Sequence, residues 1–123
     1  MSPGILVYGY DKNQAEQIQE SITIALKKTI FLKSAFDKES ELIESLIKAD
    51  NNNMFEDNKT KIIMFIDMID SEVRTVLNSF PKNIQRPIFC GLTEHNISWP
   101  FKELKEHLLE EQAFWKQQKP QNE

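Results

Sequence analysis

Short apolar runs alternate along this chain with segments in which apolar residues are spaced three or four apart. The spaced segments are typical of amphipathic helices, and the runs are typical of strands. The run at residues 62–66 is apolar throughout, which predicts a central strand buried on both faces. Each strand is followed by one helix. The four predicted strands lie at residues 5–8, 29–32, 62–66 and 87–92.

Polar residues and prolines predict where the helices begin and end. Ser, Asp and Asn side chains accept hydrogen bonds from the free N–H groups of a first turn. Pro81 ends the third helix, and Pro100 lies near the first turn of the fourth. The candidate caps are Asp11 or Asn13 for the first helix, Asp37 or Ser40 for the second, and Asp70 or Ser71 for the third.

This alternation predicts a three-layer α/β fold of the flavodoxin or receiver kind, with a four-stranded parallel sheet. Strands one and three are the most apolar and belong in the middle, whereas Lys27, Lys28 and Lys33 surround strand two and protect a sheet edge. The predicted order is 2-1-3-4. Helices two and three would cover one face and helices one and four the other. Residues 1–123 form one domain, with a flexible loop near 50–60 and a frayed tail after residue 116.

Composition narrows the class of protein. The 123 residues are 40% hydrophobic and 28% charged, with a net charge of -4 and no basic cluster, so neither a nucleic-acid surface nor a membrane span is predicted. Cys90 is the single cysteine and has no internal disulfide partner. Together with the absence of a secretory signal at the start, this favours a cytoplasmic protein, and the Lys, Ile, Asn and Glu bias suggests a bacterial one.

Three segments carry a resemblance to a known family: ILVYGYDKN, KIIMFIDM and RPIFCGLTEHNISW. Together they resemble a small bacterial family catalogued only as a domain of unknown function. The mark of that family is a strand, then Thr-x-x-Asn-x-x-Trp, then an amphipathic helix. In this chain the mark falls on Thr93, Asn96 and Trp99. The resemblance implies a fold and no biochemistry.

The chain also resembles, more distantly, the receiver domains of response regulators. Asp67 ends the third strand, where the resemblance implies a phospho-accepting aspartate. Receivers carry an acidic pair after the first strand, but here Gly9 and Tyr10 stand there and leave Asp11 alone. A divalent ion would therefore lack a carboxylate ligand, so the resemblance supports the fold rather than the phosphotransfer chemistry.

Polar residues that follow the predicted strands form a candidate ligand-binding site. The carboxyl ends of parallel strands share one edge of a sheet, and ligands bind where the strand order reverses. The alternative is structural: Asn96 or Ser98 caps the last helix, and Trp99 shields its entrance. The candidate residues are Tyr10, Asp11, Asp67, Thr93, Glu94, His95, Asn96 and Trp99.

The sequence assigns no catalytic residue, no metal ligand and no cofactor. His95 could act as a base near neutral pH, but no activated nucleophile accompanies it, and Cys90 lies within a strand. We therefore expect a non-catalytic binding or regulatory module. The alternatives are a degenerate receiver-like phospho-acceptor that uses Asp67, and a small-ligand enzyme at the carboxyl edge of the sheet.

The expected partner is a second copy of the chain, besides an unidentified protein or small ligand. Strand four has no lysine within it, so its edge is unprotected. Phe114 and Trp115 lie near the end of the last helix, where a sheet would not bury them fully. These features predict a homodimer that forms through strand four, the end of the last helix, or both.

Overall fold

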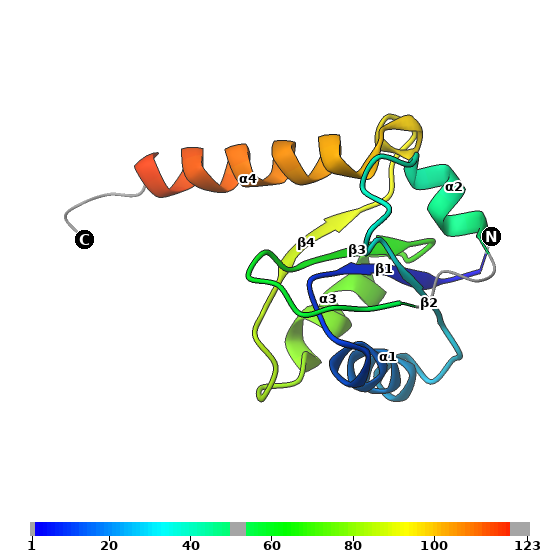
Figure 1. Cartoon of the computed structure of the whole chain (residues 1–123). Coiled ribbons are helices and arrows are strands. Elements are labelled where there is room, and N and C mark those ends of the chain that lie inside the picture. Colours follow the sequence, from blue (N-terminus) through cyan, green and yellow to red (C-terminus); the bar gives the residue numbers. More distant parts are fainter. Residues whose placement is uncertain (1, 50–53, 119–123) are drawn as a thin grey trace.

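The computed structural model describes residues 2–49 and 54–118, which form an α/β fold with helices on both faces of one sheet (Figure 1). The strands are β1 (Gly4–Tyr8), β2 (Phe31–Ser34), β3 (Ile62–Ile66) and β4 (Ile88–Gly91). The helices are α1 (Lys12–Leu26), α2 (Ile43–Lys48), α3 (Asp70–Ser79), the short 3-10 helix η1 (Asn96–Ser98) and α4 (Phe101–Gln118).

The sheet is mixed. Its strand order is β2-β1-β3-β4, as predicted, and β2 and β4 are its edges. The outer pairs β1–β2 and β3–β4 are parallel, but the central pair β1–β3 is antiparallel, with Leu6 opposite Met64. The prediction of a wholly parallel sheet is therefore wrong.

The segment that precedes β3 explains the antiparallel pair. Two donors of this segment reach the Gly9 carbonyl, which follows β1: the Asn58 N–H at 3.0 Å and the Lys61 Nζ at 2.7 Å. Lys61 is only 6% exposed and also donates to the Asn58 carbonyl at 2.6 Å and to Asp57 Oδ1 at 2.8 Å. These bonds hold the chain at the carboxyl end of β1, so β3 begins where β1 ends.

The helices are distributed over the two faces of the sheet differently from the prediction. α1 and α3 cover one face, and α2 and α4 cover the other (Figure 1). β3 runs opposite to β1, and β4 lies at the sheet edge opposite to β2. Because both the strand direction and the side are reversed, the crossovers β1-α1-β2 and β3-α3-β4, when they have the same hand, place α1 and α3 on the same face. Each helix buries apolar residues against the sheet: Ala15, Ile18 and Ile22 in α1, Val76 in α3, Ile43 and Leu46 in α2, and Phe101, Leu104 and Leu108 in α4.

The fold consists of two similar β-α-β-α units related by an approximate two-fold axis between β1 and β3. β2 pairs with β1 in the register in which β4 pairs with β3. Two reciprocal bonds cross the axis where α2 and α4 begin: Ile43 N–H to the Trp99 carbonyl at 2.9 Å, and Phe101 N–H to the Glu41 carbonyl at 3.0 Å. The two units differ in length at α2 and α4, because α4 continues well beyond the sheet (Figure 1).

The predicted helix starts are confirmed in one case only. Asp11 caps α1 and accepts from the Gln14 N–H at 2.8 Å. The caps of α2 and α3 are Leu42 and Ile69, and neither makes a side-chain cap hydrogen bond, so the polar caps predicted there are wrong. At α3 the polar contribution comes instead from Glu72, whose Oε1 accepts from the Ile69 N–H at 3.1 Å.

Two predicted mobile segments fall partly outside the described residues. The loop near 50–60 includes residues 50–53, which are not described, and residues 54–60 form no helix or strand. The predicted tail includes residues 119–123, also not described, while α4 extends to Gln118. Over residues 2–49 and 54–118, no helix combines the length and the apolar character that a membrane crossing requires.

Candidate binding site

The antiparallel pairing of β1 and β3 divides the predicted site between the two ends of the sheet. Tyr10 and Asp11 follow β1, whereas Asp67 follows β3 and therefore lies at the opposite end. Thr93 follows β4, which is parallel to β3, so it lies at the same end as Asp67. The structure therefore separates Tyr10 and Asp11 from the other candidates, contrary to the expected convergence.

Tyr10 and Asp11 have structural contacts. The Tyr10 side chain is 1% exposed, and its hydroxyl donates to the Gln85 carbonyl at 2.6 Å. Burial raises the pKa of this hydroxyl well above its usual value, so it remains a neutral donor. The Lys61 ammonium lies 5.1 Å from the centre of the Tyr10 ring. Asp11 is the exposed cap of α1. Tyr10 thus joins the start of β3 to the segment before β4.

Thr93 and Asn96 form a closed hydrogen-bonded turn at the end of β4. The Thr93 N–H donates to Asn96 Oδ1 at 2.8 Å, and the Asn96 N–H donates to Thr93 Oγ1 at 3.0 Å. The Asn96 Nδ2 donates to the Gly91 carbonyl at 3.0 Å, and Asn96 is 8% exposed. Glu94 and His95, between them, are exposed. The Thr-x-x-Asn pattern therefore builds the turn from β4 into η1.

Trp99 supports the start of α4. Its carbonyl accepts the Ile43 N–H at 2.9 Å, which ties α2 to the segment before α4. Its ring packs edge-on against His107 of α4, with the ring centres 5.5 Å apart. Trp99 is half-buried and lies beside the apolar core under α2 and α4. These contacts match a packed aromatic residue at a helix entrance.

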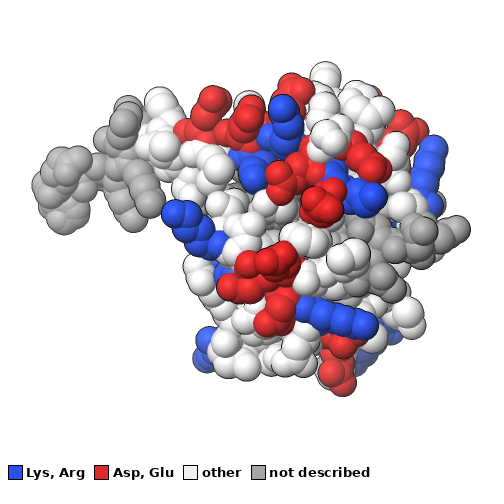
Figure 2. All heavy atoms as spheres, viewed as in Figure 1, with Lys and Arg blue, Asp and Glu red and all other residues white. Residues whose placement is uncertain are grey.

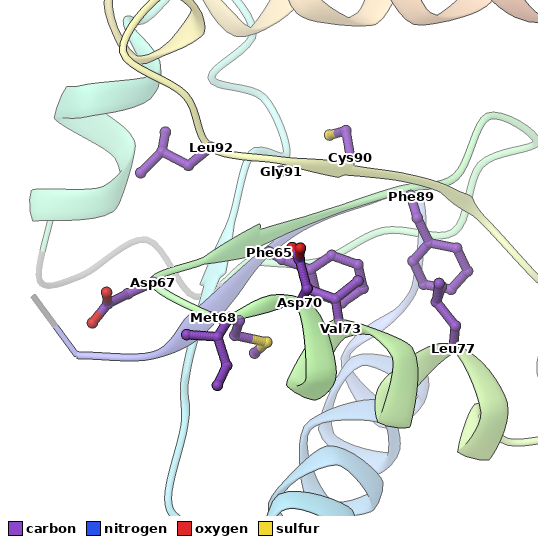
Figure 3. Close-up of a pocket in the computed structure, with 11 residues that line it drawn as sticks. Phe65, Asp67, Met68, Asp70, Val73, Leu77, Phe89, Cys90, Gly91 and Leu92 are labelled. Carbon is purple, nitrogen blue, oxygen red and sulfur yellow. The ribbon is translucent and has the colours of Figure 1, made fainter.

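An apolar groove of about 540 Å³ lies between α3 and the outer edge of β4 (Figure 3). Phe65, Val73, Leu77 and Phe89 point toward one another in it, whereas Cys90 points to the opposite side of β4. Asp67 and Asp70 line its end near the carboxyl end of β3. The groove side chains are Phe65, Met68, Ile69, Val73, Leu77 and Phe89.

Most groove residues are absent from the predicted site, which included only Asp67 among them. Val73 and Leu77 follow the helical apolar spacing, and that pattern cannot separate a core position from a groove wall. Phe89 stacks on Phe65 with ring centres 5.5 Å apart and meets Phe80 edge-on at the same separation. One feature of the sequence indicated the edge of β4, because the last strand contains no lysine.

Reactive groups near the groove have little catalytic character. Burial raises the pKa of the Cys90 thiol to about 12, so the thiol is protonated at neutral pH and is a poor nucleophile. Among residues 2–49 and 54–118, no cluster of three or more His, Cys, Asp or Glu side chains could hold a metal ion. Acidic and basic side chains are interspersed on the face shown in Figure 2.

We expect no phosphorylation of Asp67 by a small phosphodonor. The protein is incubated with acetyl phosphate and magnesium, and incorporated phosphate is measured by intact mass. Asp11 lies at the other end of the sheet, so it cannot supply the second carboxylate of a receiver-like magnesium site. Stoichiometric labelling that disappears in Asp67→Asn would contradict this expectation.

A comparison with protein families finds a similarity that covers one unit of this fold. The family model described as Domain of unknown function (DUF3783) matches residues 61–114. This segment starts just before β3 and ends within α4, so it corresponds to the second β-α-β-α unit. The resemblance to a family of unknown function is thereby confirmed for less than half of the chain, and the match does not include the first strand.

No curated protein and no solved structure matches the chain significantly.

Proposed function

We propose that this protein is a non-catalytic interaction module that binds an extended apolar polypeptide segment along the outer edge of β4. The observation that carries the proposal is the position of the groove. It lies directly beside an edge strand, so main-chain pairing with β4 and side-chain burial against α3 can occur together. Strand addition of this kind obtains affinity from the backbone and specificity from pockets for alternate side chains.

The composition of the groove supports a peptide segment as the ligand. Its walls are apolar side chains of α3 and β4, and its end near Asp67 and Asp70 is acidic. The sheet face over Gly91 is open, because a Cβ added there would meet no atom within 4 Å. The edge carries no lysine of the kind that blocks strand addition, whereas Lys33 lies within β2.

A synthetic peptide tests the proposal. It copies residues 86–94 with Cys90→Ser, carries a fluorescent label, and is titrated with protein at low concentration while anisotropy is recorded. We expect saturable binding, with chemical-shift changes at the Phe89 and Gly91 amides and at the Val73 and Leu77 methyl groups. These groups form the outer edge and the groove wall.

Two variants at one position control this experiment. Gly91→Pro removes an N–H group at the strand edge and should weaken peptide binding at least tenfold, whereas Gly91→Ala keeps this N–H and should change it less than threefold. Equal binding by both variants would refute strand addition. A parent protein that neither binds the peptide nor self-associates would refute the proposed function.

A further inference from the structure

The inner side of β4 defines which backbone groups remain for its outer side. The Ile88 N–H donates to the Lys61 carbonyl at 2.8 Å, and the Leu92 N–H donates to the Phe65 carbonyl at 2.9 Å. In a trans peptide the carbonyl and the following N–H point in opposite directions. The Pro87 carbonyl, which precedes Ile88, therefore points away from β3.

The outer side of β4 has a self-complementary set of groups. The Gly91 carbonyl also points outward but already accepts from Asn96 Nδ2 at 3.0 Å. Alternation along the strand turns both backbone groups of Phe89 and the N–H of Gly91 outward. Pro87 contributes a carbonyl and has no N–H. The edge thus offers two donors, from Phe89 and Gly91, and two acceptors, from Pro87 and Phe89.

We propose that the segment bound at this edge is β4 of a second copy, paired antiparallel about a two-fold axis at Phe89. In this register each Phe89 exchanges both backbone bonds with the Phe89 of the partner copy. The Gly91 N–H donates to the partner's Pro87 carbonyl. The Gly91 carbonyl, which Asn96 occupies, faces the partner's Pro87, which has no N–H to donate. The N–H groups of Phe89 and Gly91 therefore both find acceptors, and no free donor or acceptor is lost where Gly91 faces the partner's Pro87.

Side chains on the groove side of β4 fit the same register. The two Phe89 rings lie on either side of the two-fold axis, in reach of each other as directly opposite residues. Gly91 lies opposite the partner's Pro87, and the space over Gly91 is open because an added Cβ would meet nothing within 4 Å. This open space accommodates the Pro87 ring.

Charge is complementary only in the antiparallel orientation. Exposed Arg86 precedes β4, whereas Asp67, Asp70 and Glu94 lie at the end to which β4 runs. Antiparallel pairing brings the end of β4 that Arg86 precedes beside the end of the partner's β4 that Glu94 follows, so the opposite charges lie at the same end of the paired strands. A parallel pairing would place like charges side by side. The proposal rests on the proposed function, because it identifies the partner at the same edge.

Sedimentation velocity over a range of concentrations tests self-association, with 14.4 kDa as the mass of one copy. We expect a dimer in the parent protein. Arg86→Glu and Glu94→Arg should each weaken it about tenfold, because two charge pairs per dimer become repulsive. The double variant should return to within about threefold of the parent, since the pairs are restored in reverse.

Backbone variants test the register independently of charge. Gly91→Pro should weaken the dimer at least tenfold, and Gly91→Ala should weaken it less than threefold. Arg86 also donates to the Leu77 carbonyl at 3.1 Å, so circular dichroism must show that its variant is folded. Glu94→Arg changes an exposed side chain in a turn and remains informative if the Arg86 variant unfolds.

Three outcomes overturn this inference. The first is a parent protein of 14.4 kDa at every concentration. The second is a dimer that neither Gly91→Pro nor the charge reversals weaken. The third is a dimer that only Trp115→Ser disrupts, which would assign the contact to the exposed end of α4. If self-association fails while the peptide of residues 86–94 binds, the proposed function stands without this inference.

Discussion

Replacing Gly9 with alanine is expected to lower the free energy of unfolding by about 3 kcal/mol or more. Gly9 has a φ of 95°, in a region that residues with a side chain rarely adopt. A Cβ at this position would lie 2.0 Å from the Thr60 carbonyl oxygen and 3.0 Å from the Lys61 Cα. These are backbone atoms, so no side-chain rotation relieves the clash.

The effect is large because the clash falls where β1 is joined to the segment before β3. The Gly9 carbonyl accepts bonds from the Asn58 N–H and from Lys61 Nζ, and the backbone shift that alanine requires would break both. Urea denaturation followed by circular dichroism measures the change. Gly91→Ala is the matched control and should change stability by less than about 0.5 kcal/mol, since its Cβ meets nothing. A loss below about 1 kcal/mol in Gly9→Ala would contradict this account.

Replacing Phe101 with alanine is expected to destabilise the protein by about 3–5 kcal/mol. Phe101 is 0% exposed and lies at the start of α4, in the core that α2 and α4 share over the sheet. Its ring centre is 5.3 Å from that of Tyr8 in β1. Alanine would leave a cavity that neighbouring β1 and β3 cannot fill, because the sheet hydrogen bonds hold them.

The control for this prediction is Phe114→Ala in the same helix. Phe114 is 53% exposed, so its removal should cost about 0.5 kcal/mol or less. The two variants carry the same chemical change and differ only in burial. Denaturation midpoints at equal protein concentration compare them. Equal losses in the two variants would show that the start of α4 is not part of the core.

The candidate site could be predicted only in part from the sequence. The polar residues after the strands were identified correctly as residues at strand ends, but their convergence depended on the direction of β3 relative to β1. The groove depends on α3 lying beside the outer edge of β4, which brings Val73 and Leu77 next to Phe89. Those contacts join segments that are distant in sequence, and the apolar spacing of a single helix contains no information about them.

The sequence by itself determined the four strands, the helices between them, the central place of β1 and β3, and the two edges. These features depend on local periodicity and on how apolar each strand is, and both can be read from neighbouring residues. Only the tertiary structure decided the direction of β3, because Asn58 and Lys61 must first reach the Gly9 carbonyl. Because of this long-range contact, β3 and β4 run opposite to the predicted direction and α1 and α3 share one face. The candidate site therefore lies at the edge of β4 and not between β1 and β3.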